Sequence, residues 1–219
     1  MDCMSFSQII LELLKGFGVT INIFFITVVF SLPLGLLISF GRMSSNNFIK
    51  AIIRAYISIM RGTPLMLQLI VVYFGPYYLF RVQMGTSYRM TAIYLAFIIN
   101  YAAYFAEIYR SGIQSMDRGQ YEAAQLLGYG RASSFFRIIL PQVIKRILPS
   151  ITNEVITLVK DTAFAFTLSV MEMFTMAKAI AARETSLVPL FIAGAFYYIF
   201  NYAVAFIFEY FEKKMNYYK

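Results

Sequence analysis

Residues 16–41, GFGVTINIFFITVVFSLPLGLLISFG, form a run of 26 positions without a charged residue. A helix needs about 20 predominantly apolar residues to cross the hydrocarbon core of a bilayer, which is about 30 Å thick. The run is long enough to cross a membrane as one helix. We therefore take it as the first membrane span.

The composition of the whole chain agrees with this interpretation. Of its 219 residues, 60% are hydrophobic and 14% are charged, and the mean hydropathy is +0.67. Soluble domains carry about 25% charged residues. Histidine is absent and Cys3 is the only cysteine, so the commonest general base is missing and a disulfide framework or thiolate metal site cannot form. The sequence predicts an integral membrane protein and disfavours the chemistry of soluble enzymes.

Four further stretches are long and apolar enough to cross. They comprise residues 55–80, 90–106, 147–171 and 185–208. The charged residues inside them are few: Arg61, Glu154, Lys160 and Asp161. No linker or repeat divides the chain, so we expect one all-α domain over residues 1–219 with five transmembrane helices.

The loop charges orient these spans. With the N-terminus outside, the inside segments hold twelve basic residues: Arg42, Lys50, Arg54, Arg110, Arg118, Arg131, Arg137, Lys145, Arg146, Lys213, Lys214 and Lys219. The outside segments hold five: Lys15, Arg81, Arg89, Lys178 and Arg183. Cytoplasmic loops carry an excess of Lys and Arg. We therefore expect an outside N-terminus and a cytoplasmic C-terminus, and we attribute the basic excess to membrane topology rather than to nucleic-acid binding.

The longest segment outside the spans covers roughly residues 110–146 and is expected in the cytoplasm. Helix-forming residues follow Gly119, and Gly128 provides a stop, which together predict a short surface helix. Tyr121 and Ala124 fall on one face of this helix, and Glu122 falls on another. Periodicity alone leaves two interpretations open. The helix lies on the membrane surface, or its small residues let another chain approach closely.

A longer pattern in this segment is more specific. It reads Glu122-Ala123-Ala124, three residues, Gly128, nine residues, Ile138, one residue and Leu140-Pro141. This pattern resembles the EAA motif of ABC import permeases. In that family the segment, here about residues 117–141, forms the coupling helix that sits in a groove of the ATPase. The resemblance implies these ATPase-coupling residues: Glu122, Ala123, Ala124, Gly128, Leu140 and Pro141.

Other motifs extend the resemblance over most of the chain. They are Arg61-Gly62-Thr63-Pro64, the stretch 100–114, Asn153-Glu154 and Lys160-Asp161-Thr162. These motifs are similar to those of the polar amino-acid uptake permeases. That resemblance implies the type I ABC importer permease fold and a multi-pass location in the bacterial inner (plasma) membrane. Residues 162–166, TAFAF, are bulkier and less polar than the Ser-containing sequence common in that family.

The resemblance also implies a set of partners. They are a second permease copy or close paralogue, two ATPase subunits, an extracytoplasmic substrate-binding protein, an amino-acid substrate and membrane lipid. The sequence holds no Gly-x4-Gly-Lys-Ser/Thr phosphate loop. We therefore expect ATP and Mg²⁺ to bind to the partner ATPase, with no catalytic residue, metal site or cofactor in this chain.

The ionisable residues within the spans need a partner or water, because a charge at the centre of a bilayer costs about 3 kcal/mol or more. We predict a substrate pathway made by Arg61, Thr63, Asn100, Glu154, Thr157, Lys160 and Asp161. Its carboxylates would meet the ammonium group of an amino acid, and its arginine the carboxylate. The alternative is that these groups only hold helices together across a subunit or dimer interface.

The sequence therefore predicts a transport subunit that is not itself an enzyme. The competing hypothesis is a secondary amino-acid transporter or channel without an ATPase partner. Intramembrane charges would be equally expected in such a protein, whereas the surface helix at 119–128 would not be needed. Glu107 and Arg110 lie three residues apart at the inner end of the third span, where we expect a structural ion pair.

Overall fold

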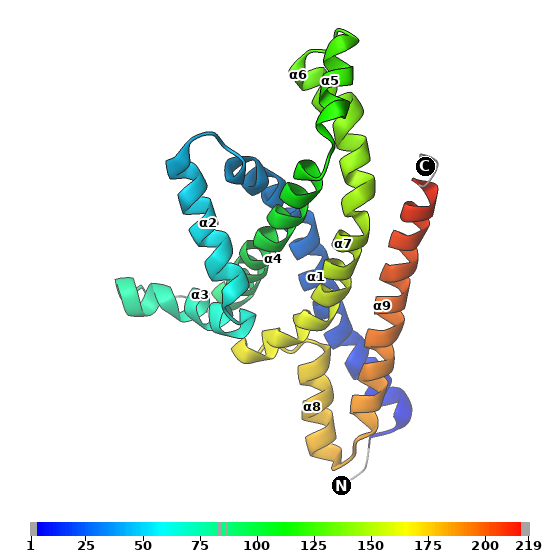
Figure 1. The fold of residues 1–219 in the computed structure, drawn as a ribbon. Helices are drawn as coiled ribbons and strands as arrows, with labels where there is room; N and C mark the ends of the chain where they lie inside the picture. Colours follow the sequence, from blue (N-terminus) through cyan, green and yellow to red (C-terminus); the bar gives the residue numbers. More distant parts are fainter. Residues whose placement is uncertain (1–3, 83–84, 86, 216–219) are drawn as a thin grey trace.

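The structure is a computed structural model that describes residues 4–82, 85 and 87–215 (Figure 1). All regular secondary structure in this part of the chain is helical. The elements are α1 (Phe6–Arg42), α2 (Asn47–Gly62), α3 (Leu65–Phe80), α4 (Tyr88–Gln114), α5 (Arg118–Leu126), α6 (Arg131–Ser134), the π-helix η1 (Phe135–Ile139), α7 (Leu140–Asp161), the 3₁₀ helix η2 (Thr162–Leu168), α8 (Met173–Glu184) and α9 (Val188–Lys214).

Three helices, α1, α4 and α9, are each long and apolar enough to cross a membrane. The first begins at Phe6, well before the uncharged run. Its start is explained by a capping box: the Gln8 N–H donates to the Ser5 hydroxyl, and the Ser5 N–H donates to the Gln8 side chain at 2.9 Å. The polar first turns of α1 are thus helical although they are not part of the predicted span.

Two of the expected spans are broken. Helices α2 and α3 meet at a bend of 112°, and the segment from Arg131 to Leu168 meets α8 at 60°. Thr63 is extended (φ −121°, ψ 148°) because the residue before a proline is pushed out of the helical region. The predicted stretches 55–80 and 147–171 are therefore not straight crossings. The structure has three membrane-spanning candidates, or five if each bent pair counts as one span.

Helix α4 is the central element, and it packs on α1, α2, α3 and α7. Its contact with α1 is close because Gly35 lacks a side chain. A Cβ added at Gly35 would lie 2.7 Å from the Cβ of Phe105 and 3.0 Å from the carbonyl oxygen of Ala102. Phe97, Tyr101 and Phe105 are buried along α4. The middle of the molecule is therefore built around one helix, which also carries Asn100.

The two ends of the molecule differ in what they present (Figure 1). One end holds α5, α6, the turn between α1 and α2, and the C-terminal end of α9; we call it the α5 end. The other holds the start of the chain and the turn between α8 and α9, and we call it the α8 end. The start and end of the described chain thus lie at opposite ends. This is the relation expected for an odd number of crossings.

Candidate functional site

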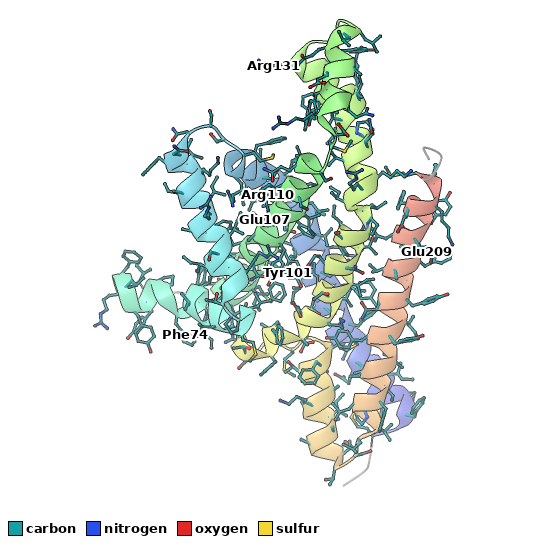
Figure 2. All side chains as sticks on the ribbon, viewed as in Figure 1. Phe74, Tyr101, Glu107, Arg110, Arg131 and Glu209 are labelled. Carbon is teal, nitrogen blue, oxygen red and sulfur yellow. The ribbon has the colours of Figure 1, made fainter. Side chains whose placement is uncertain are left out.

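A cavity of about 420 Å³ lies where α2 gives way to α3, between α4, α7 and η2. It is lined by Thr63, Pro64, Leu65, Met66, Asn100, Tyr101, Tyr104, Glu154, Thr157, Asp161 and Phe164. Five of the seven predicted pathway residues are among them: Thr63, Asn100, Glu154, Thr157 and Asp161. Figure 2 shows Tyr101 at mid-height, far from both ends of the molecule. The structure therefore gathers residues from distant parts of the sequence at one central place.

The bend between α2 and α3 is held by two buried amide side chains, Gln68 and Asn100. Gln68 Nε2 donates to the carbonyl oxygens of Met60 (3.0 Å) and Thr63 (3.1 Å) and to Thr63 Oγ1 (2.9 Å). Asn100 Nδ2 donates to Gln68 Oε1 at 2.9 Å and to the Met60 carbonyl at 3.1 Å. The end of a helix leaves carbonyls without helical partners, and these amides supply them. Asn100 is therefore committed to the bend that shapes the cavity.

Two carboxylates, Glu154 and Asp161, form the acidic side of the cavity. They are seven residues apart on α7 and so share one face of that helix. The Tyr101 hydroxyl donates to Asp161 Oδ2 at 2.7 Å. No salt bridge includes either carboxylate in the described part of the chain. The cavity therefore offers two acidic groups that suit a cation such as an ammonium group.

The two basic residues predicted for the pathway, Arg61 and Lys160, lie in different places relative to the cavity. The guanidinium carbon of Arg61 is 5.1 Å from the centre of the Tyr104 ring, and that ring lines the cavity. Arg61 is thus at the rim, with its charge over an aromatic face. Lys160 is exposed and is not among the lining residues, because it lies about 100° around the helix from Asp161. The structure does not bring Lys160 to the site.

Sequence reasoning missed several residues of this site, chiefly Tyr101, Tyr104 and Gln68. For Tyr101 a signal existed, since it lies in a stripe with Phe97 and Phe105 at four-residue spacing on a predicted span. A tyrosine hydroxyl in such a buried stripe needs a hydrogen-bond partner, and an acidic residue on another span can provide one. Phe164, in the stretch 162–166, forms part of the cavity wall.

The predicted coupling segment forms the tip of the α5 end (Figure 1). The Asp117 carboxylate accepts the Gly119 N–H at 2.7 Å and caps α5, and Gly128 follows the helix in the left-handed region at φ +80°. The predicted short helix is therefore confirmed. Tyr121 and Ala124 lie on the face of α5 that turns toward the rest of the segment. Partial burial there raises the pKa of the Tyr121 hydroxyl.

The exposed face of α5 is not the one expected. Ala124 is 2% exposed, so it packs against its own chain and lets the segment fold closely. Glu122 and Ala123 are exposed, and after them Leu126 and Leu127 are 90% and 76% exposed. Large apolar side chains this open at a protein tip indicate an interaction surface. The accessible face of the coupling segment therefore combines a carboxylate, a small residue and two leucines.

This segment joins the cavity through η1 and α7, which follow each other in the chain. Helix α5 packs on α6 and η1, and η1 runs without a break into α7, whose first residues are Leu140 and Pro141. The Arg146 guanidinium donates to the Ser115 carbonyl at 2.5 Å and hydroxyl at 2.9 Å, tying α7 to the end of α4. At 1.5 Å per residue, Glu154 lies about 20 Å along α7 from Pro141. The elements η1 and α7 thus connect α5 with Glu154 and Asp161.

An ion-pair cluster fixes α1 to α4 near the α5 end (Figure 2). Arg110 Nη2 lies 2.5 Å from Glu107 Oε2, and Arg42 Nε lies 3.5 Å from Glu107 Oε1. The predicted structural pair of Glu107 and Arg110 is confirmed, and Arg42 extends it to a second helix. These charges hold the scaffold together and are absent from the cavity lining.

Comparisons with known proteins agree with this architecture. Residues 31–217 match the family described as "Binding-protein-dependent transport system inner membrane component". The chain is 35% identical over 207 residues to a putative glutamine transport system permease protein of Rickettsia felis, covering 94% of each chain. It is 37% identical over 205 residues to the arginine transport system permease protein ArtQ of Bacillus subtilis, covering 93% of this chain and 92% of that protein.

A solved structure, described as an amino acid ABC transporter with histidines, resembles this chain with a TM-score of 0.86. The sequence identity is 32%, and the match covers 98% of this chain and 99% of the other. Family, sequence and fold thus agree over nearly the whole length. The chain belongs to the binding-protein-dependent transport system inner membrane components, the permeases of ABC importers.

Proposed function

We propose that this chain forms the membrane route of an ATP-driven importer of polar amino acids in a bacterial inner membrane. It receives substrate from an extracytoplasmic binding protein, works with a second permease copy or paralogue, and is driven by two ATPase subunits that bind ATP and Mg²⁺. In this proposal the α5 end is cytoplasmic and each bent helix pair is one span, which gives five spans.

The chain is a permease subunit of an ABC importer and not an enzyme. Its family is defined by dependence on a binding protein. The alternative of a secondary transporter or channel without an ATPase loses its support, because such a protein has no use for an exposed coupling segment. The related proteins are named as amino-acid permeases, which supports amino acids as the substrate class.

One observation carries the proposed mechanism: α7 bears the coupling segment at one end and the cavity carboxylates farther along. ATPase closure would move α5 and, through the rigid helix, shift Glu154 and Asp161 relative to α4. The carboxylates would hold the ammonium group of the amino acid. Arg61 at the rim would meet its carboxylate. Lys160 was part of the predicted pathway, and its position outside the cavity leaves it no part in this proposal.

The test is reconstitution of the permease with its ATPase and binding protein in liposomes. Glu122→Lys should abolish uptake and ATPase stimulation by the binding protein, because the charge reversal lies on the accessible face of α5. Glu154→Gln should leave ATPase binding unchanged and lower uptake about tenfold or more, as expected for loss of a charged contact of about 1.5–3 kcal/mol. Asn153→Gln, on the exposed side of the same helix turn, is the control.

Two results would contradict the proposal. Wild-type coupling and ATPase binding in Glu122→Lys would remove α5 from the docking surface. A complex that falls apart in Glu154→Gln while uptake by the remaining intact complex is normal would make the carboxylate a structural element. That outcome would favour the alternative in which the intramembrane charges only hold helices together.

A further inference from the structure

Helix α2 carries a polar stripe that the predicted pathway includes only at one end. The stripe consists of Asn47, Lys50, Arg54, Ser58 and Arg61, which recur every three or four residues and so share one face. All of them are exposed except Lys50, which is half-buried. The opposite face of α2 packs on α1 and α4, where the Tyr56 hydroxyl donates to the Ile99 carbonyl at 2.5 Å.

The stripe connects the cavity with the α5 end. A hollow of about 450 Å³ follows its first part and is lined by Asn47, Lys50, Ala51, Arg54, Ala55 and Ser58. Beyond it lies Arg61, whose charge rests on the cavity residue Tyr104. From Asn47 to Arg61 the stripe rises about 21 Å at 1.5 Å per residue. Figure 1 shows α2 descending from the turn at the α5 end to its bend with α3.

The cations of the stripe do not take part in the salt bridges of the described chain. No carboxylate in the described part of the chain forms a salt bridge with Lys50, Arg54 or Arg61. Arg42 and Arg110, near the same end, both pair with Glu107. The stripe therefore differs from Arg42 and Arg110, whose pairing with Glu107 fixes α1 to α4.

The surroundings of the stripe require water beside it. Its neighbours on one flank are the exposed apolar residues Phe48 (72%), Ile52 (53%) and Ile59 (57%), which suit a hydrophobic environment. Lys50 and Arg54 lie toward the end of α2 that we expect at the cytoplasmic face, and Arg61 lies deeper, where an unpaired cation in hydrocarbon costs about 3 kcal/mol or more. A helix with this composition is stable when its apolar flank faces lipid or protein and its cations face an aqueous space.

We infer that the α2 stripe is one wall of an aqueous route between the cavity and the α5 end, and that this route favours anions over cations. The inference deepens the proposed function and rests on it for the direction of transport. Glu154 and Asp161 suit the ammonium group of an amino acid, and the stripe suits its carboxylate. The substrate class that fits both is an amino acid with a neutral or acidic side chain, because a cationic side chain would be repelled along α2.

The test uses small charged reagents on the complete transporter in liposomes. Ser58→Cys, made in a background where the only cysteine is replaced by Cys3→Ser, places one thiol in the middle of the stripe. An anionic sulfonatoethyl and a cationic trimethylammonioethyl methanethiosulfonate are compared, each normalised to its rate with a free thiol. We expect the anionic reagent to react on the order of tenfold faster, given two cations within about 6 Å along the helix. Arg54→Gln/Arg61→Gln, which removes both of these cations, should bring the ratio close to one.

The matched control is Lys213→Gln/Lys214→Gln, which removes two cations from the same end of the molecule on α9 and should leave the ratio unchanged. Lack of labelling by either reagent would place the stripe against lipid or a second copy and overturn the inference. Equal rates would also overturn it. Ala55→Cys, which lines the same hollow, replaces Ser58→Cys if that variant does not fold. Labelling needs no transport, so a failure to move amino acids would contradict the proposed function alone.

Discussion

The cavity and the tip of the α5 end differ in how far the chain itself provides contacts for their side chains. In the cavity wall, Asn100 and Gln68 are hydrogen-bonded to each other and hold the α2–α3 bend, and Tyr101 donates to Asp161. At the tip, Leu126 and Leu127 are almost fully open, with no cover from the chain itself. A wall that is complete in one subunit can bind a small solute in a defined geometry. A tip that exposes leucines needs another protein to complete it.

The largest effect is expected where the tip is changed. Leu126→Asp places a charge where we expect an apolar anchor in the ATPase groove, so the Kd for the ATPase should rise about 100-fold, or roughly 3 kcal/mol. The measurement is binding of the purified permease to the ATPase in detergent. Leu187→Asp, at a leucine of the α8 end that is 65% exposed, is the control and should bind normally. Equal affinity of both variants would show that Leu126 is not an anchor.

A smaller effect is expected in the bend. Asn100→Leu removes both donated hydrogen bonds and leaves the Gln68 Oε1 acceptor buried without them, which should cost about 2 kcal/mol. For a chain of this size that corresponds to a fall in Tm of about 4–8 °C. Thermal unfolding of the purified transporter measures it, with the exposed Asn153→Leu as the control. An unchanged Tm would mean that the bend is held by Pro64 and packing alone.

Next comes the contact between α4 and α7. Tyr101→Phe keeps the ring and loses the 2.7 Å hydrogen bond to Asp161, so we expect a loss of about 1 kcal/mol and a fall in Tm of about 2–4 °C. Tyr198→Phe, on the exposed side of α9, should leave Tm unchanged. If the two variants behave alike, the hydroxyl contributes nothing to the cavity wall and Asp161 is held by water instead.

Local features of both regions were predictable from the sequence, and long-range features were not. Asp117 and Gly128 mark the start and stop of α5 by local chemistry, and the intramembrane charges identified Glu154 and Asp161. Gly62 and Pro64 predict the break between α2 and α3 by local chemistry, but the pairing of Gln68 with Asn100, 32 positions away, is encoded by no pattern within 55–80. The inward position of Ala124 likewise depends on how α5 packs on η1, which helical periodicity does not specify.

The smallest effect separates two neighbours on α7. Lys160 was predicted to line the pathway with Asp161, yet only Asp161 reaches the cavity. Lys160→Gln should therefore change uptake by less than about twofold, as is usual for an exposed position away from a site. Asp161→Asn, one residue further, removes a charge from the cavity wall and should lower uptake about tenfold or more. Both are measured in the same liposome assay, so that each serves as the control for the other. A loss of uptake in Lys160→Gln as large as in Asp161→Asn would require the lysine to face the route in another state of the transporter, since a helix turns adjacent side chains about 100° apart.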